Sequence, residues 1–233
     1  MSPGRGLVCV SLAGGEPGGQ LQELQRLAPR ADVVEIRLDT LENPDIGSWL
    51  ATMERPLLFT NRPAWEGGNF SGPEEQRLAL LARAIELDAA YIDLELATEP
   101  ERRLALIDMA RDKTTQVIVS SHDFKATPPQ ADLRQTLEQM MASGADCGKI
   151  VTTAQDSDDV IRVLGLLEIA HQAAFPLSAF CMGGPGRISR FAGLYLGGFM
   201  NYVALDQASA TAPGQLSAAH CQSLIQLFED YAD

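Results

Sequence analysis

The sequence predicts an α/β protein of the (β/α)8 barrel (TIM barrel) class, and two observations lead to this prediction. Eight short runs rich in Val, Ile, Leu and Phe recur along the 233 residues, and segments with helical spacing of apolar residues separate them. No long linker, low-complexity tract or repeat interrupts this alternation, so residues 1–233 are expected to form a single barrel domain. An open doubly wound sheet uses the same alternation and is the alternative.

The expected strands are the apolar runs themselves. They cover residues 7–12, 33–38, 56–61, 91–96, 116–121, 148–153, 176–181 and 201–206. Three of the intervening helices show a buried face as apolar residues three or four positions apart. These faces comprise Leu78, Leu81 and Ile85 in one helix, Leu133, Leu137, Met140 and Met141 in another, and Leu224, Ile225 and Phe228 in the last.

Polar and glycine-rich segments mark the ends of these elements. Thr127 followed by Pro128 is typical of a helix N-cap with proline in the first turn. The segments 14–19 and 183–186 match neither the dinucleotide nor the phosphate-loop fingerprint, and they are expected to be turns. In a barrel, segment 183–186 would form a flexible loop after the seventh strand.

The chain is acidic and carries few features of an exported or membrane protein. Its net charge of −13 makes nucleic acid and anionic membranes poor partners, although positioned arginines can still draw a small anion into a cleft. No apolar run approaches the roughly 18 residues of a membrane helix, and the first is too short for a signal peptide. We therefore expect a cytoplasmic protein. No CxxC pair occurs, so reduced, buried thiols are expected at Cys9, Cys147, Cys181 and Cys221.

Charged residues inside the second expected strand need an explanation, because both faces of a barrel strand are mostly buried. Glu35, Arg37 and Asp39 alternate with apolar residues, so the period of two places all three on one face. If the apolar set packs against helices, the charged set points into the barrel near its carboxyl-terminal rim. A binding site and a structural ion pair are equally compatible with this pattern.

Polar residues also occur in or just after the other expected strands. Barrel active sites are assembled from the carboxyl-terminal ends of several strands, so these residues are expected to converge on one site. They are Asn61 and Arg62, Asp93 and Glu95, the run Ser120 to Asp123, Lys149, and Met182 with Gly183.

Lys149 and His122 are the most informative of these residues. Lys149 stands in an otherwise apolar strand, and burial favours the neutral, nucleophilic form of an amine. The alternative for Lys149 is an exposed lysine at a strand edge, and the alternative for His122 is a hydrogen-bonded histidine of the core or the rim. His171 and His220 fall in helical segments and are expected at the surface.

Two other kinds of site find little support in the sequence. Ser121, His122 and Asp123 are consecutive, and neighbours on a strand point to opposite faces, so they cannot form a catalytic triad. No HExxH motif or close histidine pair occurs, so no metal site is expected.

Seven segments, in order along nearly the whole chain, resemble type I 3-dehydroquinate dehydratases. They are VVEIRLD (33–39), TNRPAWEGG (60–68), YIDLEL (91–96), VSSHDF (119–124), GKI (148–150), CMGGPGRISRFAG (181–193) and ATAPGQLS (210–217). The resemblance implies dehydration of 3-dehydroquinate to 3-dehydroshikimate in the shikimate pathway of aromatic amino acid biosynthesis.

The resemblance also implies roles for individual residues. Lys149 would form a Schiff base, His122 would be the general acid and base, and Glu66 would orient the histidine. The substrate, a small anionic cyclic hydroxy-keto acid, would be held by Glu35, Arg37, Arg62, Met182, Arg190, Thr211 and Gln215. The resemblance implies no metal or organic cofactor. It also implies a homodimer.

This chain departs from the family pattern at three places. Thr211 stands where serine is usual, Phe180 replaces a common methionine, and segment 183–186 replaces a more charged loop. Two other functions stay open, namely a class I aldolase-like Schiff-base lyase and a non-catalytic carboxylate-binding domain on the same scaffold. Biosynthetic and quinate-catabolic roles also stay open.

Overall fold

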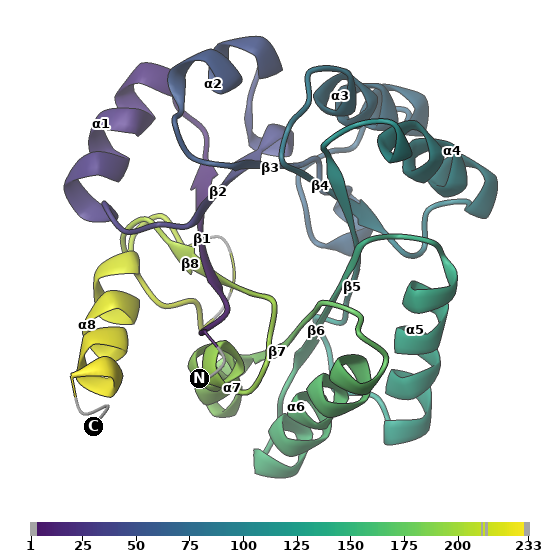
Figure 1. Cartoon of the computed structure of the whole chain (residues 1–233), viewed down its shortest axis with the longest axis vertical. Coiled ribbons are helices and arrows are strands. Elements are labelled where there is room, and N and C mark those ends of the chain that lie inside the picture. Colours follow the sequence, from purple (N-terminus) through teal and green to yellow (C-terminus); the bar gives the residue numbers. More distant parts are fainter. Residues whose placement is uncertain (1–3, 211, 213, 231–233) are drawn as a thin grey trace.

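The computed structural model describes residues 4–210, 212 and 214–230, and it places eight parallel strands inside a ring of helices (Figure 1). The order in the sheet is β7-β6-β5-β4-β3-β2-β1-β8, and every paired neighbour is parallel. The strands are β1 (Leu7–Ala13), β2 (Val33–Arg37), β3 (Leu57–Thr60), β4 (Tyr91–Glu95), β5 (Gln116–His122), β6 (Cys147–Thr153), β7 (Leu177–Met182) and β8 (Met200–Ala204). All eight expected strands are confirmed.

The sheet closes on itself between its two end strands. The backbone N–H of Phe199 donates to the carbonyl of Leu177 at 2.9 Å, and that of Met200 donates to the Ser178 hydroxyl at 3.1 Å. The sheet is therefore a nearly closed (β/α)8 barrel, and the doubly wound alternative is wrong.

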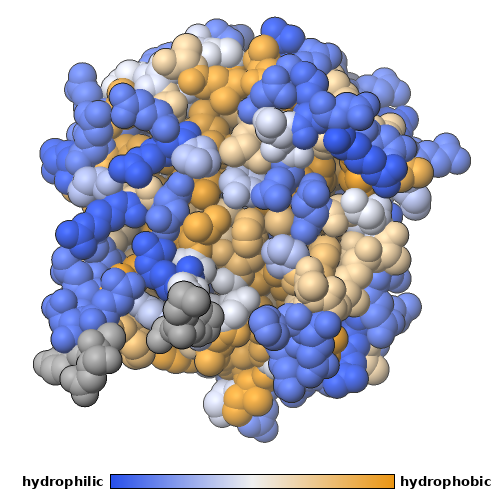
Figure 2. Space-filling view, viewed as in Figure 1, coloured by the Kyte–Doolittle hydropathy of each residue, from blue (hydrophilic) through white to orange (hydrophobic). Residues whose placement is uncertain are grey.

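In the part of the chain that the structure describes, eight helices and two short 3-10 turns lie between and after the strands. They are α1 (Pro17–Leu27), η1 (Leu38–Thr40), α2 (Ile46–Thr52), η2 (Ala64–Glu66), α3 (Glu74–Glu86), α4 (Pro100–Arg111), α5 (Gln130–Ala142), α6 (Ser157–Gln172), α7 (Gly183–Tyr195) and α8 (Ala218–Glu229). Hydrophilic side chains gather over the outer helices on the face that Figure 2 shows. None of the described helices is long and apolar enough to cross a membrane.

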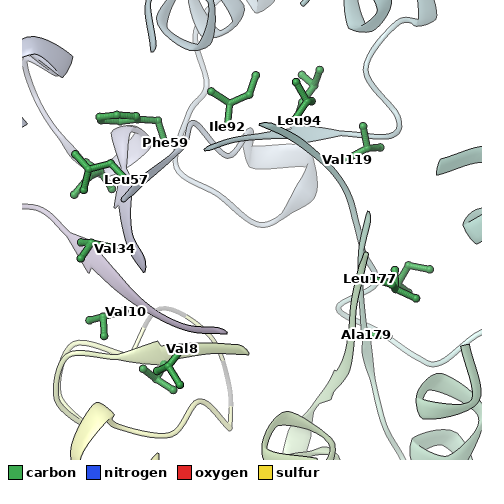
Figure 3. Close-up of a cluster of buried hydrophobic side chains, with 14 of the residues drawn as sticks. Val8, Val10, Val34, Leu57, Phe59, Ile92, Leu94, Val119, Leu177 and Ala179 are labelled. Carbon is green, nitrogen blue, oxygen red and sulfur yellow. The ribbon is translucent and has the colours of Figure 1, made fainter. Parts of the chain in front are cut away.

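Alternate residues of each strand belong to two separate apolar regions, as a period of two requires. The larger region lies between the strands and the helices, and Figure 3 shows side chains such as Phe59, Ile92 and Leu177 pointing outward into it. The smaller region fills the barrel interior toward the amino-terminal ends of the strands, and it includes Cys9, Val33, Leu58, Ile118, Cys147 and Met200.

The barrel interior becomes polar two residues further along most strands. The residues at these next inward positions are Ser11, Glu35, Thr60, Asp93, Ser120, Lys149, Phe180 and Tyr202, all of them buried. The sequence therefore builds an apolar floor and places charged groups above it, toward the carboxyl ends of the strands.

Several details of the helices differ from expectation. Helix α5 begins at Gln130 after Pro129, so Thr127 is not its N-cap; its hydroxyl bonds to Thr152 at 2.8 Å instead. Phe228 on α8 is 56% exposed, because it packs on Phe191 and Tyr195 rather than in the core.

Segment 183–186 is also not a loop, because it forms the first turn of α7. A Cβ atom on Gly186 would lie 2.6 Å from the carbonyl oxygen of Cys181, so glycine there lets the helix start directly against its strand. The buried, unbridged state of the four cysteines and the surface positions of His171 and His220 are confirmed.

The core between sheet and helices should dominate stability. Leu81 on α3 is fully buried there, and Leu81→Ala should lower the free energy of unfolding by about 2–5 kcal/mol through lost burial and a residual cavity. Leu104→Ala, at an exposed position on α4, should change it by less than about 0.5 kcal/mol. Urea unfolding measures both values, and equal effects would contradict this account of the core.

Candidate active site

A cleft opens at the carboxyl-terminal end of the barrel, with about 520 Å³ of space not filled by protein atoms. Among the ten site residues predicted from the sequence, nine line this cleft: Glu35, Arg37, Arg62, Glu66, His122, Lys149, Met182, Arg190 and Gln215. The tenth, Thr211, lies outside the described residues. The walls of the cleft also include Ser11, Thr60, Gly67, Phe124, Val151, Phe180, Tyr202 and Ala212.

Lys149 on β6 is buried, with 5% of its surface exposed, so the alternative of a lysine at an exposed strand edge is wrong. Its Nζ atom lies 3.1 Å from Oδ2 of Asp93 and 3.8 Å from the centre of the Tyr202 ring. The amine is therefore held between a carboxylate and an aromatic face.

Asp93 on β4 is a completely buried carboxylate with three partners. Besides Lys149, it bonds to Nη2 of Arg62 at 2.8 Å and accepts from the Ser120 hydroxyl at 2.5 Å. Burial alone would raise the pKa of Asp93, but the charges of Arg62 and Lys149 outweigh it and hold that pKa below its usual value. The carboxylate thus stays ionised beneath the cleft.

Arg62 extends this network toward the rim. Its Nη1 atom bonds to Glu95 at 2.6 Å and lies 3.2 Å from Glu66, both of them buried. Glu95 also pairs with Arg77, a fully buried residue of α3 that is held by Glu74 at 2.7 Å. A buried ion network therefore fixes the Arg62 side chain from both sides.

His122, at the end of β5, faces Glu66 across 3.3 Å, from Nδ1 to Oε2. Burial, then the charges of Arg62 and Lys149, lower the pKa of His122 well below its ordinary value. Burial also raises the pKa of Glu66 to about 8. The imidazole is therefore neutral at neutral pH, and the hydrogen bond with Glu66 fixes the orientation of its ring.

Phe124 and Gly67 complete the surroundings of the histidine. The Phe124 ring stacks on His122 with centroids 6.1 Å apart and an angle of 18° between the planes. Gly67 has a φ of +77°, and a Cβ there would lie 2.3 Å from the Phe124 ring. Glycine is thus required twice, for the left-handed turn after Glu66 and for the space that Phe124 occupies.

The second strand supplies both a site and an ion pair. Glu35 accepts hydrogen bonds from the hydroxyls of Thr60, at 2.7 Å, and Ser11. Arg37 lines the cleft and also binds Asp39 with two hydrogen bonds, at 2.8 and 2.7 Å. Asp39 lies in η1 rather than on the strand, so the alternation ends at Arg37.

Arg190, Met182 and Gln215 approach from the opposite wall. The Arg190 guanidinium is 2% exposed and lies 4.6 Å from the centre of the Phe180 ring. Burial lowers the pKa of Arg190 to about 10, which still leaves it charged at neutral pH. The segment that carries the buried Gln215 is fixed to β8, since the N–H of Ala204 donates to Leu216 at 2.9 Å.

Two residues around the site, Arg77 and Tyr202, were not expected there from the sequence, whereas Asp93 and Ser120 were expected to converge on it but were assigned no role. Asp93 and Ser120 stood out as polar residues of strands. Each lies two positions after a residue that faces the barrel interior, so the period of two places it in the interior as well. Tyr202 gave no such signal, because tyrosine is an ordinary strand residue. Arg77 gave none either, since arginine on a helix is usually exposed.

Comparison with known proteins places this cleft in a family. The model of type I 3-dehydroquinase matches residues 8–232. The chain belongs to the type I 3-dehydroquinase family. A 3-dehydroquinate dehydratase from Desulfotalea psychrophila is 44% identical over 218 residues, which are 93% of this chain and 96% of the relative. One from Haloarcula marismortui is 37% identical, over 84% of this chain and 86% of the relative.

Solved structures of the type I 3-dehydroquinase family agree with the fold and extent of this chain. The type I enzyme of Clostridium difficile, determined with covalently modified comenic acid, superposes with a TM-score of 0.86 at 27% identity. The superposition covers 98% of this chain and 94% of that one. In residues 4–210, 212 and 214–230, no group of three or more His, Cys, Asp or Glu side chains is placed to hold a metal ion.

The pKa of Glu66 predicts a pH-dependent stability. Because the folded value of about 8 exceeds the ordinary 4.5, Glu66 contributes its full stabilisation below about pH 4.5 and loses it as pH rises through 8. Between pH 5 and 8, the free energy of unfolding should therefore fall relative to that of Glu66→Gln, by up to about 1.4 kcal/mol per pH unit.

Urea unfolding of both proteins at several pH values measures this difference. Glu42→Gln, at an exposed position on the same end of the barrel, should parallel the wild-type protein. A constant difference between wild type and Glu66→Gln would show that Glu66 is ionised throughout.

Proposed function

We propose that the chain is a 3-dehydroquinate dehydratase that acts through a Schiff base on Lys149. The observation that supports this most is the placement of a buried lysine and a neutral histidine on adjacent strands of one cleft, in a chain of the type I 3-dehydroquinase family. The relatives' names supply the substrate, and the residues supply the chemistry.

Lys149 would attack the ring ketone and form an imine. The protonated imine withdraws electrons and acidifies the neighbouring carbon, which is the role a metal or organic cofactor plays in other enzymes. No cofactor is therefore part of the proposal. The apolar floor beneath Lys149 keeps water from reaching the imine from below.

His122 would move the protons. A neutral imidazole that donates Nδ1–H to Glu66 leaves Nε2 free to accept a proton from the carbon next to the imine. The resulting imidazolium then protonates the departing hydroxyl, which leaves as water. The lowered pKa of His122 keeps the base in its active form at neutral pH and makes its conjugate acid a strong one.

The remaining cleft residues would hold the substrate. Arg190 would pair with the carboxylate, and Gln215 would add a neutral hydrogen bond. The hydroxyls would bind the polar groups of the opposite wall, and Met182 would pack on the ring. That wall comprises Glu35, Arg37 and Arg62. The predicted contact from Thr211 stays a prediction, as do the single domain, the homodimer and the cytoplasmic location.

Two other functions make different predictions. A class I aldolase would also trap substrate on Lys149, but it would not convert 3-dehydroquinate to a conjugated enone. A non-catalytic binding domain would give neither product nor a reducible imine. Absorbance of the enone during incubation with 3-dehydroquinate therefore separates the proposed function from the other two, and borohydride trapping separates those two from each other. No absorbance change would reject the proposed function.

Substitutions at Lys149 and His122 should fail in different ways. Lys149→Ala should give neither turnover nor a covalent adduct when borohydride is added with 3-dehydroquinate. His122→Ala should lose about 10²–10⁴-fold in turnover or more, since positioned acid–base groups contribute that much and this one acts twice. It should still form the imine, if more slowly, because the amine and its surroundings remain.

Intact-protein mass spectrometry after borohydride treatment reads out both variants. Lys113 is an exposed lysine that does not line the cleft, so Lys113→Ala should trap substrate like the wild-type protein. An adduct on Lys149→Ala would refute the lysine assignment, and normal turnover by His122→Ala would refute the histidine assignment.

Arg190→Lys should weaken capture of the carboxylate while the protein stays folded. Lysine keeps the charge but loses the two-pronged hydrogen-bond geometry, so kcat/KM should fall by about tenfold to a hundredfold. Arg134→Lys, at an exposed position on α5, is the matched control and should behave as wild type. An unchanged kcat/KM for Arg190→Lys would remove this residue from the substrate site.

A further inference from the structure

Two aromatic side chains in the cleft each lie against one of its cations. The Lys149 Nζ atom is 3.8 Å from the centre of the Tyr202 ring, and the Arg190 guanidinium is 4.6 Å from that of Phe180. The two ring centres are 6.1 Å apart, with planes tilted by 43°. We infer that Phe180 and Tyr202 form an aromatic platform that positions Lys149 and Arg190 for the reaction, an inference that rests on the proposed function.

The platform lies where the barrel has fewest strand-to-strand hydrogen bonds. Phe180 is on β7 and Tyr202 is on β8, and both are 4% exposed in the barrel interior. Each ring lies two residues beyond one of the residues that join β7 to β8, Ser178 and Met200. The contact between the rings therefore continues the closure of the barrel up to the floor of the cleft.

Burial explains why an aromatic surface suits these two cations. Lys149 and Arg190 have lost most of their hydration, and the negative face of an aromatic ring partly replaces it. For Lys149, the ring and the Asp93 carboxylate both contact the amine and restrict its position in the cleft. For Arg190, the ring supports a guanidinium whose pKa burial has lowered to about 10.

The platform would face an unchanged charge when the imine forms. A lysine ammonium and a ketone give a protonated imine and one water molecule. The carbon–nitrogen double bond replaces the carbon–oxygen one, and two of the three ammonium protons leave with the oxygen. Because the nitrogen group carries one positive charge before and after, Tyr202 and Asp93 stabilise both states without rearrangement.

The ring of Tyr202, rather than its hydroxyl, carries this role. Among the described residues, no hydrogen-bond partner is found for the buried Tyr202 hydroxyl. Tyr202→Phe keeps the aromatic face and removes only the hydroxyl, whereas Tyr202→Leu removes the face. This pair of variants separates the platform from a hydrogen-bonding role.

The first test reads the Lys149 cation without any substrate. The chain has three lysines, so acetic anhydride labelling followed by peptide mass spectrometry resolves Lys149 from Lys113 and Lys125. In Tyr202→Leu, the midpoint of the pH profile for Lys149 labelling should fall by about 0.5–1.5 pH units, because the ring no longer favours the cation. Tyr202→Phe should keep the wild-type midpoint for Lys149 labelling, and Lys113 and Lys125 should keep their midpoints in both variants.

The second test uses steady-state kinetics with 3-dehydroquinate. Phe180→Leu should raise KM by about three- to tenfold with a smaller change in kcat, because it loosens Arg190, which binds the substrate throughout. Phe180→Tyr keeps an aromatic ring, and its KM should be close to that of the wild-type protein. Tyr202→Leu should instead lower kcat more than it changes KM, since its ring supports the reacting nitrogen.

Tyr91→Leu is the matched control for both tests. Tyr91 is also an inward-facing tyrosine, but it packs against Phe199 on the floor and touches neither cation. This variant should keep the wild-type labelling profile and KM. Where a leucine variant does not fold, as judged by circular dichroism, methionine at that position fills more of the ring's volume and takes its place.

The outcomes separate this inference from the proposed function. A Lys149 midpoint that is the same in Tyr202→Leu and the wild-type protein would overturn the platform, whatever the enzyme does. So would a KM of Phe180→Leu no higher than that of Tyr91→Leu. If the wild-type protein shows no turnover, the proposed function fails, and the labelling profile still decides whether Tyr202 supports the cation.

Discussion

The buried carboxylate of Asp93 is the group on which the charged interior of the barrel depends. It pairs with both Lys149 and Arg62, and Arg62 in turn pairs with Glu95 and Glu66. Leaving a buried charge without its partner typically costs about 3–5 kcal/mol, so these positions are fixed jointly rather than one by one. The orientation of His122 follows from the same network, because Glu66 is its hydrogen-bond partner.

The period of two within each strand makes such a network possible. One set of side chains packs outward against the helices, so the barrel is stabilised independently of its interior. The inward set can then change from apolar to charged within two residues, as from Cys147 to Lys149. Stability and chemistry thus come from different faces and different levels of the same eight strands.

The sequence predicted the elements more completely than their ends and contacts. Strands were evident because apolar runs of this length have few other uses, whereas the start of α5 and the exposure of Phe228 depend on packing that spacing does not encode. Charged residues in or just after a strand, such as Lys149 and Arg62, revealed the cleft, since burying them needs a reason. The partners Arg77 and Tyr202 could not be found this way, because only the fold brings them beside residues far away in sequence.

The junction between β7 and β8 divides the cleft into parts of unequal rigidity. Six strands, β1 to β6, are held on both sides by regular ladders, and two of them, β5 and β6, carry His122 and Lys149. Arg190 and Gln215 follow the two strands that meet with the fewest backbone hydrogen bonds among the described residues. Local opening is easiest where such bonds are sparse, so the wall that carries Arg190 and Gln215 should open more readily than the wall that carries His122 and Lys149.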